Sequence, residues 1–155
     1  MKYRQGDLLV VHQVPLRRND ADTIFRAYVG ENDGRNEWEQ LWGKKIAPRE
    51  VIVCCIPFFV YDLALGDEVE IDSEFALQRI LRKSGQVTFR VWFCGRGVGR
   101  RNDILRDMNA MNVLMEWSSD NLLAVSVLDI EAQKLADYLQ FHENEGELEY
   151  ETGCT

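Results

Sequence analysis

The stretch EVIVCCIPFFVYDLALGDEVEID, residues 50–72, decides how the rest of the chain is arranged. Residues 51–56 form a continuous apolar run, which is typical of a strand buried on both faces. Pro57 ends that strand because it has no backbone N–H to donate. Gly66-Asp67 is a turn pair, and the alternation of apolar and acidic residues over 68–72 predicts a second strand with one solvated face.

Several short motifs in and after this stretch resemble those of a small bacterial family described as domain of unknown function 4265. The motifs are Pro57-Phe58-Phe59, LALGDEV at 63–69, KSG at 83–85, TFRV at 88–91 and the strand-like LEYE at 148–151. The resemblance covers residues 38–151. It implies a C-terminal helix followed by a strand, and it implies no activity, because the family has no assigned activity.

Length and composition predict one domain. The chain has 155 residues, of which 46% are hydrophobic, and this is enough for a proper core. The domain can divide into two lobes, a mostly β lobe at 1–83 and a β-α-β-α-β lobe at 84–155. No apolar run approaches the ~20 residues of a membrane helix, and residues 1–14 lack the layout of a signal peptide. We therefore expect a cytoplasmic protein without a membrane partner.

The cysteine and histidine content predicts neither a metal site nor a cofactor. The chain has four cysteines, two histidines and no CxxC motif, whereas a structural zinc site needs about four well-spaced ligands. A disulfide framework is typical of small secreted chains, so buried free thiols are the simpler interpretation.

The charge is negative overall and unevenly distributed. The formal net charge of −8 opposes nucleic-acid binding and favours basic partners. Residues 79–106 nevertheless carry eight basic side chains against Asp103 alone, and residues 129–155 carry eight acidic side chains against Lys134 alone. The chain therefore has one basic and one acidic region.

The first half of the chain predicts an antiparallel β meander, or a small barrel-like sheet. Apolar alternation and turn residues place its strands at 7–14, 23–29, 38–46, 51–56, 68–72, 75–81 and 86–94. The Asp33-Gly34 pair predicts a hairpin between the second and third of these strands.

The second half predicts a β-α-β-α-β unit in a ferredoxin-like arrangement, which makes the whole protein α+β. Asn102 is a suitable N-cap for a first helix, and apolar residues recur at helical spacing from Ile104 to Met115. A buried strand follows at 122–128. Asp129 caps a second helix, Gly146 stops it, and a last strand follows.

The acidic C-terminal region gives the first functional hypothesis. Charged faces are often only solvated, and they also protect edge strands from aggregation. Charge complementarity is also how an acidic inhibitor covers the basic active site of a toxin. We therefore expect a bacterial protein-binding module, an immunity- or antitoxin-type inhibitor of a basic partner. Its expected contacts are Asp137, Glu143, Glu145, Glu147 and Glu149, with Trp38 and Trp42 as aromatic anchors.

The basic loop gives the alternative hypothesis, a regulatory domain that senses an anionic small molecule or nucleotide. Glycines let backbone N–H groups approach an anion at the start of a helix. The residues expected to bind are Arg90, Arg96, Arg100 and Arg101. The glycine spacing at 95, 97 and 99 matches neither GxGxxG nor the P-loop, so a solvated loop is the simpler interpretation. RNA binding is disfavoured by the net charge and by the lack of an RNP motif.

An enzyme is the weakest of the hypotheses, and we predict no catalytic residues. Glu116 beside Trp117 is the nearest candidate for a perturbed carboxylate, although a surface acid at a helix end is the simpler interpretation. A nucleophile–base pair of Cys54 or Cys55 with His12 stays open from sequence alone.

Overall fold

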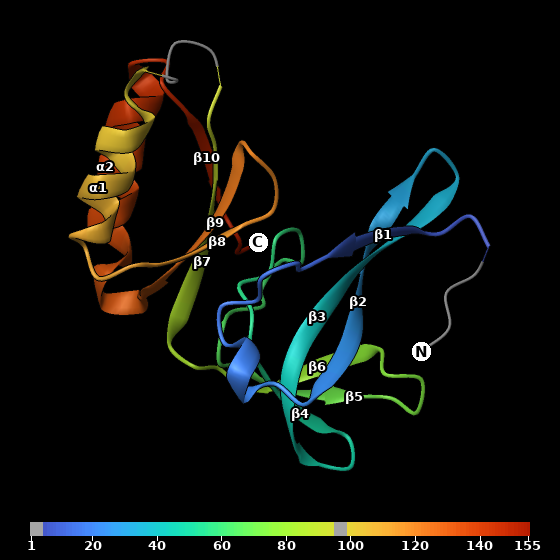
Figure 1. The fold of residues 1–155 in the computed structure, drawn as a ribbon. Coiled ribbons are helices and arrows are strands. Elements are labelled where there is room, and N and C mark those ends of the chain that lie inside the picture. Colours follow the sequence, from blue (N-terminus) through green and yellow to red (C-terminus); the bar gives the residue numbers. More distant parts are fainter. Residues whose placement is uncertain (1–4, 95–98) are drawn as a thin grey trace.

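The computed structural model describes residues 5–94 and 99–155 and has an α+β fold with two β-sheets (Figure 1). The six-stranded sheet ends at Arg82 and the four-stranded sheet begins at Gln86. Each sheet has its own hydrophobic core, and a third, smaller cluster of Ile56, Phe58, Leu65 and Ala124 connects them. In the described part of the chain, neither helix is long and apolar enough to cross a membrane.

The N-terminal sheet contains six strands. They are β1 (Leu8–Val11), β2 (Thr23–Asn32), β3 (Arg35–Ala47), β4 (Glu50–Val53), β5 (Glu68–Ile71) and β6 (Leu77–Arg82). Strands β2 to β6 pair antiparallel in sequence order. Strand β1 instead pairs parallel with β3, so the prediction of a wholly antiparallel sheet was wrong for this strand. The reason is the long loop between β1 and β2, which contains a 3-10 helix at Arg18–Asp20.

The predicted hairpin is confirmed. Asn32 pairs with Arg35 across a two-residue turn, and Asp33 and Gly34 have φ values of 50° and 74°. Positive φ at both central positions is the geometry of the tight hairpin turn that Asp-Gly favours.

Strand β2 also approaches β6. The N–H of Arg26 on β2 donates to the carbonyl oxygen of Phe75, just before β6, at 2.8 Å.

The predicted buried strand at 51–56 is shorter than expected. Strand β4 ends at Val53, and residues 54–67 form an irregular segment that is mostly buried; we call it the plug. The N–H of Cys54 still donates to the carbonyl oxygen of Trp42. The N–H groups of Ile56 and Phe58 donate instead to buried carboxylates and not to a neighbouring strand. Apolar composition therefore predicted burial, and the predicted strand is confirmed as far as Val53 and wrong for residues 54–56.

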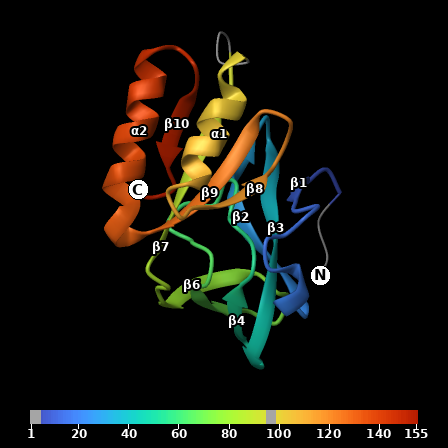
Figure 2. The same cartoon turned by 60° about the vertical axis from the view of Figure 1, so that its left-hand side comes forward.

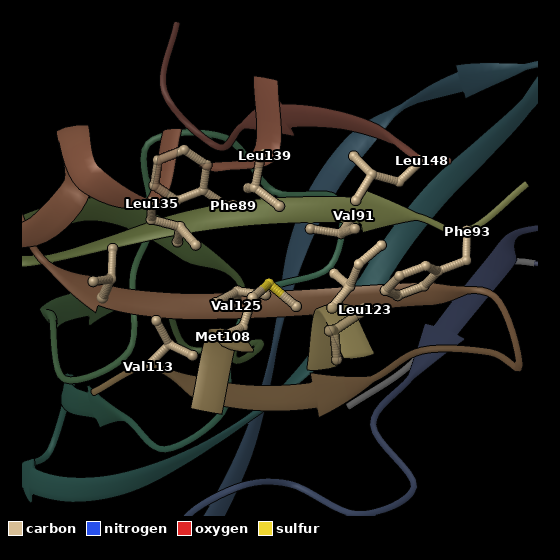
Figure 3. Packing of buried hydrophobic residues seen from close by; sticks show 12 residues of the cluster. Phe89, Val91, Phe93, Met108, Val113, Leu123, Val125, Leu135, Leu139 and Leu148 are labelled. Carbon is tan, nitrogen blue, oxygen red and sulfur yellow. The ribbon is translucent and has the colours of Figure 1, made fainter. Parts of the chain in front are cut away.

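The C-terminal sheet contains β7 (Gln86–Trp92), β8 (Leu114–Trp117), β9 (Leu122–Leu128) and β10 (Glu149–Thr152). Their order across the sheet is β10-β7-β9-β8, with every neighbouring pair antiparallel. Helices α1 (Arg101–Asn109) and α2 (Ala132–Asn144) lie together on one face of this sheet (Figures 1 and 2). Figure 3 shows their side chains meeting those of β7 and β9, among them Phe89, Val91, Met108, Val125 and Leu139.

The first predicted helix was wrong at its C-terminal end. We expected it to continue to Met115, but α1 ends at Asn109 and residues 114–117 form β8. Asn112 has a φ of 57°, a left-handed conformation that breaks the helix. Asn102 is not the cap either, because the helix already begins at Arg101. The second half therefore has the connectivity β-α-β-β-α-β.

Gly43 on β3 offers a test of the packing between β3, β4 and β2. A Cβ at this position would lie 2.1 Å from Cγ1 of Val51 and 3.1 Å from Cε1 of Phe25. We expect Gly43→Ala to lower the free energy of unfolding by about 1–3 kcal/mol through overpacking. Gly99→Ala, whose added Cβ meets no atom of the described residues within 4 Å, is the matched control. Equal urea midpoints for the two variants would contradict this packing.

Candidate functional site

A buried Glu–His–Glu triad joins the two sheets. His12, just after β1, donates from Nε2 to Oε1 of Glu39 on β3 at 2.8 Å, and from Nδ1 to Oε1 of Glu116 on β8 at 2.5 Å. The three residues are 3%, 0% and 4% exposed, respectively. The imidazole also stacks on Phe58 of the plug, with ring centroids 3.9 Å apart.

The two carboxylates of the triad also hold the plug in place. Glu39 accepts hydrogen bonds from the backbone N–H groups of Phe58, Phe59 and Val60, at 2.6, 2.9 and 3.0 Å. Glu116 accepts one from the N–H of Ile56 at 2.9 Å. Because no strand in the described part of the chain pairs with the plug at these residues, the carboxylates replace the backbone acceptors that a sheet would supply.

The triad carries a histidinium. Burial alone would lower the pKa of His12, but the hydrogen bonds and negative charges of Glu116 and Glu39 outweigh it and raise the pKa from 6.5 to about 9. Both ring nitrogens donate to carboxylates, so His12 has no lone pair with which to act as a base. We assign the triad a structural role.

The nucleophile–base pair left open by the sequence is not formed. His12 is saturated by Glu39 and Glu116, and the Sγ of Cys55 faces the backbone of Trp42. Burial raises the pKa of the Cys55 thiol well above 9, which keeps it protonated. The interpretation of Glu116 as a surface acid at a helix end was wrong, because Glu116 is buried on a strand. Among the described residues, no group of three or more His, Cys, Asp or Glu side chains could hold a metal ion.

A cavity of about 210 Å³ opens where the helix-free face of the C-terminal sheet meets the plug. Its lining combines aromatic, aliphatic and charged side chains: Phe59, Arg90, Trp92, Leu122, Glu149, Tyr150 and Glu151. Trp92 pairs with Glu149, and Arg90 with Glu151, across the β7–β10 ladder. The cross-strand register therefore places each carboxylate beside an aromatic or basic residue.

Arg90 is a buried wall of this cavity, with only 4% of its surface exposed. Its Nη1 donates to Oε1 of Glu151 at 3.0 Å and its Nη2 to the carbonyl of Val60 at 2.7 Å. The guanidinium lies 4.6 Å from the ring centroid of Tyr61, whose hydroxyl also donates to Glu151. The Nε of Arg90 is buried without an acceptor among the described residues.

The predicted acidic contacts divide into two groups. Asp137 and Glu145 are exposed on and just after α2, and Glu149 is exposed on β10. Glu143 instead accepts from the N–H of Tyr150 at 3.2 Å, and Glu147 from Nδ1 of His142 at 2.7 Å. These last two carboxylates help to fasten β10 to α2, so they are less available to a partner.

The predicted aromatic anchors lie on the other sheet. Trp38 and Trp42 are on β3, away from α2 and β10 (Figure 1). Arg26 lies 4.3 Å from the ring centroid of Trp38, and Arg18 lies 5.5 Å from that of Trp42. The structure therefore does not bring these indoles together with the acidic residues. Among the described residues it instead places exposed Phe141 between Asp137 and Glu145, and exposed Trp92 beside Glu149.

The predicted anion-binding arginines do not converge on one site within the described residues. Arg90 lines the cavity beside β10, whereas Arg101 lines a different cavity and lies 5.1 Å from the ring of Phe93 and 4.6 Å from that of Trp117. Arg101 also donates to the carbonyl of Asp120. Arg100 is exposed directly before α1, and Arg96 lies outside the described residues.

Comparisons with known proteins identify a family and a fold. The family model described as domain of unknown function (DUF4265) matches residues 39–150, close to the range expected from the sequence motifs. No curated protein matches the chain. A solved structure of a hypothetical protein from Neisseria gonorrhoeae is similar with a TM-score of 0.74 and 20% sequence identity, over 85% of this chain and 94% of that one. At this identity the similarity establishes the fold alone.

Proposed function

This chain belongs to the family of domain of unknown function DUF4265, and from that premise we propose that it is a non-enzymatic bacterial protein-binding module. Its proposed role is that of an immunity- or antitoxin-type inhibitor, which neutralises a basic partner toxin by direct binding. A cytoplasmic location belongs to the proposal, since four free cysteines suit a reducing compartment.

The outer face of α2 is the observation that carries this proposal. Asp137, Phe141 and Glu145 follow one another at intervals of four residues, so they lie side by side along the helix. Phe141 is 60% exposed although it is a large aromatic residue. An exposed aromatic side chain between two carboxylates suits an interface whose centre is apolar and whose rim is charged.

The overall charge supports the same partner class. With a net charge of −8, the protein attracts a basic protein over a distance and repels nucleic acid. Charge complementarity of this kind raises the association rate, and salt weakens it. The alternative of an anion sensor has less support, because Arg90 and Arg101 line different cavities.

We also propose finer names for the two halves of the fold. The β-α-β-β-α-β connectivity and the order β10-β7-β9-β8, with both helices on one face, support a ferredoxin-like half. The approach of Arg26 to Phe75 supports a barrel-like N-terminal sheet.

The proposal predicts loss of the partner on charge reversal of α2. In a tagged pull-down from the native host, Asp137→Lys/Glu145→Lys is expected to weaken partner binding by at least about tenfold, because close charge pairs across an interface become repulsive. The control is Glu31→Lys/Glu50→Lys, which makes the same charge change at exposed positions of the N-terminal sheet. Equal retention of the partner by the two double variants, both shown by circular dichroism to be folded, would overturn this interface.

A further inference from the structure

The cavity beside β10 lies outside the proposed α2 interface, and its volume limits what it can hold. Its volume of about 210 Å³ is smaller than the roughly 300–1,000 Å³ of sites for drug-sized ligands. The space therefore suits one amino-acid side chain or a molecule of that size.

The walls of the cavity favour a long side chain that ends in a cation. Phe59, Leu122 and Tyr150 offer apolar surface to an aliphatic stem. Trp92 is 42% exposed at the cavity, and the face of an indole is the aromatic surface that attracts cations most strongly.

The charges of the cavity also favour a cation. The carboxylate of Glu151 already binds Arg90 and the hydroxyl of Tyr61, so the opposite charges of Glu151 and Arg90 offset each other. The side chain of Glu149 has no hydrogen bond or ion pair among the described residues, which leaves one unmatched carboxylate at the cavity. An anion would meet this carboxylate, whereas an ammonium or guanidinium group would pair with it.

Arg90 adds a requirement for a hydrogen-bond acceptor. Both of its Nη atoms are occupied, and its Nε is buried without an acceptor among the described residues. A buried donor without a partner costs free energy, so a carbonyl oxygen that reaches it is favoured. A basic residue within a polypeptide provides a cation and a carbonyl oxygen together, whereas a simple polyamine provides only the cation.

We propose that this cavity receives the side chain of an arginine or lysine of the basic protein partner. The inference rests on the proposed function, and it adds a second anchor on the sheet face opposite α2. Glu149 pairs with the cationic end, Trp92 covers it, and Arg90 offers its Nε to a carbonyl oxygen of the same residue.

The first test uses single-residue probes, with no partner present. N-acetyl-arginine methylamide and N-acetyl-lysine methylamide are titrated while the indole N–H resonance of Trp92 is followed by NMR, with N-acetyl-norleucine methylamide as the uncharged control. We expect a saturable shift with at least one basic probe, a dissociation constant at least about tenfold higher in Glu149→Gln, and no change in Glu145→Gln. No shift with either basic probe, an equal response to norleucine, or an unaltered affinity in Glu149→Gln would overturn the inference.

The second test separates the cavity from the α2 interface. Trp92→Leu and Glu149→Gln are compared with Asp137→Lys/Glu145→Lys in the partner pull-down. Weakened binding in all three folded variants supports the cavity as an anchor. Weakened binding in the α2 variant alone overturns the cavity inference and leaves the proposed function standing. If the wild-type protein retains no basic partner, the proposed function and this inference fall together, even where the probes bind.

Discussion

Replacement of Glu39 by alanine is expected to lower the free energy of unfolding by about 3–5 kcal/mol, the usual cost of removing one partner from a buried ion pair. The carboxylate is fully buried, and it holds His12 and three backbone N–H groups of the plug. Without it, the histidinium loses one of its two carboxylates and the N–H groups at Phe58, Phe59 and Val60 lose their acceptor. The loss should therefore detach the plug from β3 as well as weaken the triad.

Urea denaturation followed by circular dichroism measures this effect. Glu31→Ala, which removes an exposed carboxylate on β2, is the matched control and should change stability little. Glu39→Gln retains the shape of the side chain and provides a milder variant if the alanine variant does not fold. A loss below about 1 kcal/mol in both Glu39 variants would fit a solvated carboxylate and would rule out the buried triad.

The second large effect is a dependence of stability on pH. His12 has a folded-state pKa of about 9 against 6.5 for the free side chain, so the folded state binds the proton more tightly. The stabilisation is therefore complete below pH 6.5, and it is lost as the pH rises through about 9. At 1.36 kcal/mol for each pKa unit, the loss is about 3 kcal/mol.

A His12→Gln variant isolates the contribution of the histidine. It should be less stable than the wild type near pH 6, and the difference between the two should shrink as the pH approaches 10. At each pH, the free energy of unfolding of the variant is subtracted from that of the wild type. The difference removes the contributions of other groups that titrate in this range. A difference that is constant from pH 6 to pH 10 would mean that His12 is not the titrating group.

Local patterns in the sequence predicted most of the strands. The Asp33-Gly34 turn, the long alternation over 86–94 and the second helix each depend on residues that are close in sequence, and the structure has a hairpin, β7 and α2 at these places. The motifs after Pro57 led to the family whose model matches residues 39–150. Local periodicity and turn chemistry were sufficient for these features.

Other parts of the fold depend on distant residues. The plug is as apolar as a strand, yet its N–H groups are satisfied by Glu39 and Glu116. The apolar stripe from Ile104 to Met115 continues through a turn at Asn112 into β8, so helical spacing persisted by coincidence beyond the end of α1. Propensity is overridden where tertiary contacts supply the hydrogen-bond partners.

The triad could be predicted only in part. Glu39 alternates in phase with Leu41, and both are fully buried, so the period of the strand already pointed Glu39 inward. The pairing of His12 with Glu116 joins residues 104 positions apart, and no local pattern specifies it. The exposure of Phe141 could not be predicted from the acidic residues that flank it in sequence.

The measurement that tests the proposed function most directly is a pull-down from the native host with the tagged wild-type protein, eluted by a salt gradient and followed by mass spectrometry of each fraction. We predict one stoichiometric basic protein that elutes only at high salt, because charge pairs across the interface are screened there. Addition of the purified acidic protein should then abolish the activity of that partner. Recovery of no protein partner, or of nucleic acid alone, would contradict the account.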